Sequence, residues 1–282
     1  MGKLGLIAGG GGLPVEIAED CRARGRPIFV IRLAGMADPA LEAFPGEEAG
    51  VAELGRCVRL LRRAGCEQVC FAGIVRRPAD FSALRPDLQA LKYLPRVVAA
   101  ARGGDDALLR AILGVFESEG FEVEGVGQAA ASLRLGPGSL GAVAPDEAHR
   151  QDIHAALEAA RDVGRTDVAQ GAVARGGEVV AREGADGTDA MLARLPQAPA
   201  ERRGVLAKLP KPAQDRRVDL PTIGVRTVER AAQAGLAGIV GAAQGLLVVD
   251  RAAVRAAADR LGLFVIGVDG QDGAEPPPAG RS

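Results

Sequence analysis

The sequence predicts an α/β protein with an N-terminal Rossmann-like domain built on a parallel sheet and a C-terminal domain of mixed α/β structure. Short apolar strands alternate with amphipathic helices through residues 1–130, which is typical of doubly wound parallel sheets. Residues 131–147 then combine Gly and Pro with weak periodicity, as interdomain linkers do. A length of 282 residues provides for two domains of ordinary size.

The first unit of the chain is a strand, a glycine run and a helix. Residues 4–8 form a short apolar strand, residues 9–12 are all glycine, and Pro14 opens a helix. Glycines let backbone N–H groups approach a phosphate at a helix N-terminus. The dinucleotide fingerprint is incomplete, because Pro14 stands at the third glycine position and Arg32 replaces the acid that would bind a ribose. A redox dinucleotide is therefore disfavoured, and the glycine run is either a tight turn or a phosphate contact.

A second strand end in this domain is expected beside the glycine run. Residues 54–64 read as a helix with basic residues on its polar side, and residues 68–75 as an apolar strand that leads to Arg76. Ligands of open parallel sheets bind beyond the carboxyl ends of the strands. We therefore expect Gly73 and Arg76 near the glycine run, although Arg76 can equally be a solvated surface charge.

The remaining elements divide between the two domains. Helices at 88–101 and 107–118 and a strand at 121–126 complete the first domain. The C-terminal domain, residues 148–269, is predicted to contain a helix at 147–163, strands at 168–173 and 178–182, a helix at 188–195, a strand at 204–207, a helix at 225–234, paired strands at 236–240 and 246–249, a helix at 252–261 and a strand at 263–268. Residues 270–282, with three consecutive prolines, are expected to be a disordered tail.

The best candidate for an active site is the charged loop, residues 208–224 (KLPKPAQDRRVDLPTIG). Its three prolines stiffen a connection much longer than the usual one of about 4–6 residues. Lys208 and Lys211, with two arginines, can face an anion, and Asp215 and Asp219 can hold a hard cation or activate water. Such a combination suits phosphate chemistry. The alternative is a solvated surface loop of mixed charge.

Two further segments of the second domain bear on binding. Thr188 is a plausible N-cap with Asp189 in the first helical turn, and both can instead belong to a ligand-facing loop. Residues 221–224 immediately precede a helix, so their N–H groups could receive a phosphate.

Composition excludes several classes of function. A net charge of −1, a pI near 6.2 and the absence of Trp argue against a nucleic-acid partner, which needs a basic face. The four cysteines show no zinc-site spacing, so we expect free, buried thiols in a reducing cytoplasm. No signal-peptide pattern and no apolar run of about 18 residues occur, which predicts a cytoplasmic protein.

Several segments together resemble the LpxI-type UDP-2,3-diacylglucosamine pyrophosphatases of Gram-negative bacteria. The resemblance extends from Lys3 to about Asp269, and it rests on LIAGGGGLP (6–14), FAGIVRRP (71–78), GGDDALLRAI (103–112), DVAQGAVA (167–174), GTDAML (187–192) and the charged loop. It implies hydrolysis of UDP-2,3-diacylglucosamine to lipid X and UMP in lipid A biosynthesis, with Mg²⁺, or Mn²⁺ in its place, and water. It also implies a Rossmann-like N-terminal domain joined to a C-terminal catalytic domain, with the lipid product held between them.

The resemblance also implies roles for individual residues. Asp219 matches the acid on which the family depends and is the first choice for metal binding or water activation, with Asp215 supporting it as a second metal ligand. Catalytic roles are further expected for Lys208, Lys211 and Gln214, the lysines binding phosphate. Substrate binding is expected at Gly10, Gly11, Gly12, Leu13, Gly73, Arg76, Gln170, Thr188, Asp189, Leu220, Pro221 and Thr222.

Two other functions remain as alternatives. One is a non-catalytic protein that binds a nucleotide-sugar or lipid on the same scaffold. The other is an oxidoreductase that uses the glycine run, which the incomplete fingerprint makes improbable. Peripheral contact with the inner membrane and a homodimer are both compatible with the sequence.

Overall fold

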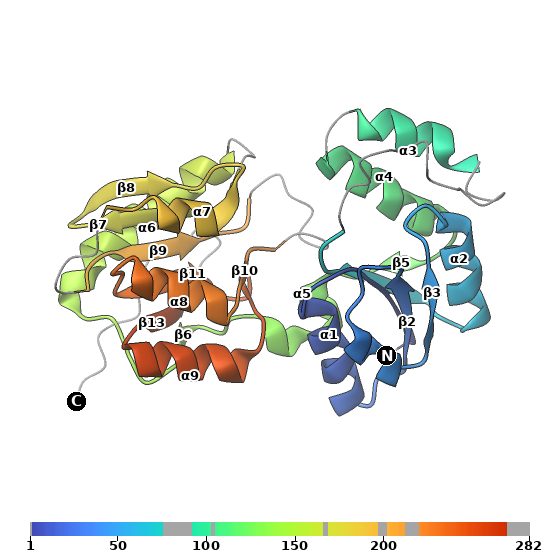
Figure 1. The fold of residues 1–282 in the computed structure, drawn as a ribbon, viewed down its shortest axis with the longest axis horizontal. Helices are drawn as coiled ribbons and strands as arrows, with labels where there is room; N and C mark the ends of the chain where they lie inside the picture. Colours follow the sequence, from blue (N-terminus) through green and yellow to red (C-terminus); the bar gives the residue numbers. More distant parts are fainter. Residues whose placement is uncertain are drawn as a thin grey trace. The chain divides into compact units, whose positions relative to one another are not determined.

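The computed structural model of the chain describes residues 2–75, 92–102, 105–165, 169–196, 202–211 and 220–269. The chain divides into two compact units, Met1–Ala131 and Ser132–Ser282, and each has its own α/β core (Figure 1). The predicted fold class is therefore confirmed. All four cysteines are free and buried, as expected. Among the described helices, none has both the length and the apolar character needed to cross a membrane.

The N-terminal unit is built on a five-stranded sheet with strand order β3-β2-β1-β4-β5, in which every pairing is parallel. In chain order its elements are β1 (Leu4–Ala8), α1 (Leu13–Ala23), β2 (Ile28–Leu33), a 3₁₀ helix (Pro39–Ala43), β3 (Gly46–Ala49), α2 (Leu54–Arg63), β4 (Gln68–Ala72), α3 (Leu94–Ala101), α4 (Asp105–Ser118), β5 (Glu122–Val123) and α5 (Val126–Ala129). Because β1 lies between β2 and β4 and is buried along its whole length, its sequence is uninterruptedly apolar. The order is that of a Rossmann-like half.

Two edge strands of this sheet differ from the prediction. β3 was not predicted, and β5 has two residues where a strand at 121–126 was expected. The sequence of β3 is GEEA, of which only Ala49 is buried. Pairing of Gly46 with Val30 of β2 holds β3 in the sheet, so its place depends on a neighbour and not on its own apolar pattern.

The C-terminal unit contains a six-stranded mixed sheet, order β6-β13-β11-β9-β7-β8, and a two-stranded parallel sheet, β10-β12. Its elements are a 3₁₀ helix at the boundary (Ala131–Leu133), β6 (Gly138–Ser139), a 3₁₀ helix (Glu147–His149), α6 (Arg150–Arg165), β7 (Gly171–Arg175), β8 (Glu178–Arg182), α7 (Gly187–Ala193), β9 (Val205–Lys208), β10 (Thr222–Ile223), α8 (Val225–Gln233), β11 (Gly238–Ala242), β12 (Leu247–Val248), α9 (Arg251–Leu261) and β13 (Phe264–Val268). The three central strands β13, β11 and β9 are parallel, and β6, β7 and β8 are antiparallel to their neighbours.

This unit has three layers, with α6 on one face of the sheet and α7, α8 and α9 on the other (Figure 1). Val205 and Ala207 of β9 pack with the residues of α6, whereas Leu206 packs with those of α7–α9. Side chains alternate along a strand, so Lys208 lies on the same face as Leu206. The last residue of β9 therefore points its charged side chain to the α7–α9 side of the sheet.

Two assignments in this unit require correction. Residues 131–147, expected as a linker, contribute β6, which pairs with β13, and Leu135, which is 1% exposed in the core. The strands expected as a pair at 236–240 and 246–249 belong to different sheets, because β11 lies between β9 and β13 while β12 pairs with β10. Closeness in sequence suggested a hairpin, but β11 has parallel partners on both sides.

Candidate active site

The glycine run at residues 9–12 joins the ends of β1 and β4. The Gly9 N–H donates to Ala72 O at 2.9 Å, and Gly10 and Ile74 exchange two backbone hydrogen bonds of 2.8 Å. Gly73, in the left-handed region with φ of +91°, lies so close to Gly10 that a Cβ atom there would be 2.7 Å from Gly10 O. A Cβ atom at Gly9 would likewise lie 2.7 Å from Ile74 O, so Gly9 and Gly73 are required by the packing of the two strand ends, whereas a Cβ atom at Gly10 would lie 3.1 Å from Met36 O.

The second half of the glycine run is more open. Gly11 and Gly12 are exposed, and α1 begins at Leu13, with Pro14 in its first turn. Gly11 has φ of +87°, and a Cβ atom there would meet no atom within 4 Å. Within the N-terminal unit the structure thus brings Gly10, Gly11, Gly12, Leu13 and Gly73 together, while Arg76 lies outside the described residues.

A matched pair of alanine substitutions separates backbone strain from steric contact in this loop. Gly11→Ala is expected to lower the free energy of unfolding by about 1–2 kcal/mol, the cost of a left-handed non-glycine residue. Gly73→Ala is expected to cost about 1–3 kcal/mol more, because its Cβ atom meets backbone atoms that cannot move away easily. Urea unfolding of both variants measures the difference. Equal losses would show that the Gly73 contact is not tight.

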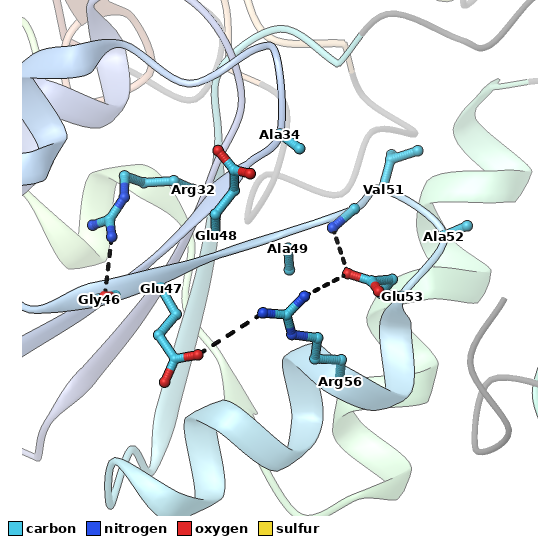
Figure 2. A pocket seen from close by; sticks show the side chains of 11 residues that line it. Arg32, Ala34, Gly46, Glu47, Glu48, Ala49, Val51, Ala52, Glu53 and Arg56 are labelled. Atoms are coloured by element: carbon cyan, nitrogen blue, oxygen red, sulfur yellow. Dashed lines mark hydrogen bonds and ion pairs between the residues drawn. The ribbon is translucent and has the colours of Figure 1, made fainter. Parts of the chain in front are cut away.

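A separate cavity of about 600 Å³ lies beyond β2 and β3 at the start of α2 (Figure 2). Arg32, at the ribose position of dinucleotide-binding folds, donates to Leu41 O at 3.3 Å and Gly46 O at 3.0 Å. Arg56 lies 3.1 Å from a Glu53 oxygen and 3.9 Å from a Glu47 oxygen. Arg32 thus ties β2 to the 3₁₀ helix before β3 and to the first residue of β3, and Arg56 pairs with two of the glutamates that line the cavity.

The charged loop of the C-terminal unit begins at Lys208. Its side chain is almost fully buried, with 8% exposed, and Nζ donates to Thr222 O at 3.3 Å. Its neighbours across the sheet are Gly171 of β7 and Gly241 of β11, and the side chains of Glu183 and Leu246 fill the spaces that these glycines leave. Lys211 is also 8% exposed. Two cations are therefore buried at the start of the loop, where an anion can be bound with little screening.

The charged loop ends beside its beginning. Pro221 O accepts from Leu247 N at 2.9 Å, and β10 pairs with β12. The Thr222 hydroxyl donates to Leu220 O at 3.1 Å, while Thr222 O accepts from Lys208. The hydrogen bond from Lys208 to Thr222 therefore joins the two ends of the loop. Gln214, Asp215 and Asp219 lie between them, outside the described residues.

A carboxylate that the sequence analysis did not select, Glu183, links two of the predicted binding residues. One carboxylate oxygen accepts from Gln170 N at 3.0 Å and the other accepts from the Thr188 hydroxyl at 2.6 Å. Gln170 O in turn accepts from Leu209 N at 2.9 Å. Thr188 is therefore not an N-cap: Asp186 occupies that position, and the Thr188 hydroxyl is used by Glu183.

The next residue of α7, Asp189, contacts the helix that follows the charged loop. Asp189 lies 2.8 Å from Arg226, which is in the first turn of α8 and follows the loop directly. Both side chains are partly exposed, so this pair stabilises little by itself. At the start of α7, a hydrogen bond from Arg194 holds the pKa of Asp186 below its usual value. Thr188 thus connects α7 to Glu183, and Asp189 connects it to the first turn of α8.

The described side chains around the loop do not by themselves form a divalent-cation site. Both oxygens of Glu183 accept hydrogen bonds and Asp189 is paired with Arg226. No group of three His, Cys, Asp or Glu residues suited to a metal occurs in the described part of the chain. The expected carboxylate ligands, Asp215 and Asp219, lie outside the described residues, so Mg²⁺ binding stays a prediction.

Comparison with known families decides what this chain is related to. The family model for the LpxI N-terminal domain matches residues 3–133, and that for the LpxI C-terminal domain matches residues 136–266. The chain belongs to the LpxI family. The resemblance inferred from the sequence is thereby confirmed.

Individual relatives place the chain within the LpxI family. It is 58% identical over 279 residues to the UDP-2,3-diacylglucosamine pyrophosphatase LpxI of Caulobacter vibrioides, covering 96% of this chain and 99% of that protein. Among solved structures, CobK precorrin-6A reductase aligns with 95% of this chain and 88% of its own at 15% identity. Its TM-score of 0.31 is too low to bear on the fold or function of an LpxI protein.

Proposed function

We propose that this chain is a UDP-2,3-diacylglucosamine pyrophosphatase of lipid A biosynthesis. The observation that carries the proposal is 58% identity to the Caulobacter enzyme over nearly the full length of both proteins. Both LpxI domain models match, so neither half of the protein is replaced by an unrelated domain. The reaction cleaves the pyrophosphate bond with water and releases UMP and 2,3-diacylglucosamine 1-phosphate, lipid X.

The buried cations of the charged loop support this chemistry. The pyrophosphate carries negative charge that must be neutralised as water attacks phosphorus. Lys208 and Lys211 are each 8% exposed and can bind phosphoryl oxygens in a weakly screened environment. We assign water activation or metal binding to Asp219, support to Asp215, and substrate contacts to Gln214 and to Gln170, Thr188 and Asp189 beside the loop.

Mg²⁺, or Mn²⁺ in its place, is proposed as the cofactor, with Asp215 and Asp219 as its protein ligands. Bound there, the metal ion would neutralise charge on the phosphoryl oxygens. In the N-terminal unit the exposed N–H groups of Gly11 and Gly12 are proposed to contact the substrate. A cytoplasmic location is also proposed, and the diacylated substrate favours peripheral contact with the inner membrane.

The proposal is tested by incubating the full-length protein with UDP-2,3-diacylglucosamine and Mg²⁺. We expect stoichiometric UMP and lipid X, loss of turnover with excess EDTA, and recovery when Mg²⁺ is restored. Chromatography of UMP with mass spectrometry of the lipid product measures both halves of the reaction. Binding of the substrate without any UMP would contradict the proposal and favour a binding protein. Undiminished turnover in EDTA would contradict only the proposed requirement for a metal ion.

A further inference from the structure

The carboxylate of Glu183 occupies a space that a glycine leaves open next to Lys208. Gly171 pairs with Lys208 across β7 and β9, and a Cβ atom at Gly171 would lie 2.9 Å from a Glu183 carboxylate oxygen. Directly opposed residues of antiparallel strands project to the same face of the sheet. Glu183 thus lies over the position opposite Lys208, on the α7–α9 face.

The hydrogen bonds of Glu183 determine the polarity of the Thr188 hydroxyl. An ionised carboxylate only accepts hydrogen bonds, so the Thr188 hydroxyl donates its single proton to Glu183 at 2.6 Å. The oxygen of Thr188 keeps its lone pairs and can serve only as an acceptor toward another group. The same carboxylate accepts from Gln170 N at 3.0 Å, while Gln170 O accepts from Leu209 N. Glu183 therefore orients one binding residue and fixes the backbone of another.

Resting on the proposed function, we propose that Glu183 is a positioning residue for substrate binding. It holds Thr188 as a hydrogen-bond acceptor for a donor of the nucleotide-sugar, a hydroxyl or an amide N–H, and it keeps Gln170 aligned with the start of the charged loop. Glu183 acts through Thr188 and Gln170 and does not itself contact the reacting atoms.

Three substitutions change this arrangement in different ways. In Glu183→Gln the amide nitrogen can only donate, so either Thr188 faces a donor in place of its acceptor or the Gln170 N–H loses its acceptor. Thr188→Val removes the hydroxyl at nearly constant shape, whereas Thr188→Ser keeps it. Gly171→Ala places a methyl group 2.9 Å from the carboxylate oxygen, and the flexible Glu183 side chain must move away. The matched control is Glu178→Gln, which changes an exposed glutamate at the start of β8, the strand that ends directly before Glu183.

Steady-state kinetics of UMP release distinguish positioning from a structural role. We expect KM for UDP-2,3-diacylglucosamine to rise about tenfold in Glu183→Gln, Thr188→Val and Gly171→Ala, with kcat and the thermal midpoint little changed. Thr188→Ser and Glu178→Gln should keep the wild-type KM. The double variant Glu183→Gln/Thr188→Val should be no worse than either single variant, because both remove one interaction.

Other outcomes would overturn the inference. A purely structural Glu183 would lower the folded, active fraction and leave KM unchanged. If Glu183→Gln does not fold, the KM values of Thr188→Val and Gly171→Ala decide, and wild-type values in both overturn the role. If the wild-type protein releases UMP and the variants have an unchanged KM, the role of Glu183 is overturned and the proposed function still stands. Absence of UMP release by the wild-type protein defeats the proposed function and this inference with it.

Discussion

Replacing Asp219 with alanine is expected to abolish UMP release while leaving both units folded. Asp219 directly precedes Leu220 in the sequence, and Thr222, three residues after Asp219, accepts a hydrogen bond from the buried Lys208. Loss of a group that activates water or holds the metal ion lowers kcat by about 10²–10⁴-fold. Single-turnover and steady-state UMP release measure the loss, and circular dichroism and thermal unfolding report the fold.

A carboxylate outside the loop provides the control for this substitution. Asp162 on α6 is 61% exposed and pairs with Arg165 at 2.9 Å on the surface of the same unit. Asp162→Ala removes the same group and should retain wild-type kcat and KM. Wild-type turnover in Asp219→Ala would disprove the assigned role, and a comparable loss in Asp162→Ala would point to a non-specific effect of charge.

Elements with a strong apolar pattern could be predicted from the sequence. β1, β9 and β13 are fully buried strands, and their apolar sequences allowed each to be predicted as a strand. β3 and β10 were not predicted, because each is short and is held by pairing with another strand, and β12 was predicted at 246–249 but with β11 as its partner instead of β10. Sequence periodicity indicates the burial of a segment's own side chains. It does not identify a strand that is stabilised mainly by pairing with a neighbouring strand.

Residues of the candidate site also differ in whether they could be predicted from the sequence. Lys208 was predicted because it begins a long, proline-containing loop that combines cations with carboxylates, as phosphate chemistry requires. Glu183 was missed, because a glutamate after an edge strand resembles a solvated charge; only the pairing of Gly171 with Lys208 places it at the site. Gly171 was the available signal, since glycine within a strand indicates close approach of another group.

Lys208 is the second position at which a substitution is expected to have a large effect, because its charged side chain is buried. A charged side chain that is only 8% exposed is expensive to desolvate, and one hydrogen bond at 3.3 Å to Thr222 O offsets part of that cost. A site that binds a pyrophosphate gains from such a preorganised cation, because its attraction to the developing charge is weakly screened. Lys208 also joins the two ends of the charged loop, so it affects both charge and geometry.

Lys208→Met is therefore expected to lower kcat/KM for UMP release by about 10²–10³-fold, with a loss of about 1 kcal/mol in the free energy of unfolding. Methionine is nearly as long as lysine and is apolar, so it can replace the aliphatic part of the buried lysine side chain with little change in packing. Pyrophosphate should raise the thermal midpoint of the wild-type protein and not of this variant. Arg230→Met, which removes an exposed cation of α8, should behave as wild type. Near-normal kcat/KM and pyrophosphate stabilisation in Lys208→Met would show that the buried ammonium serves the fold and not the phosphate.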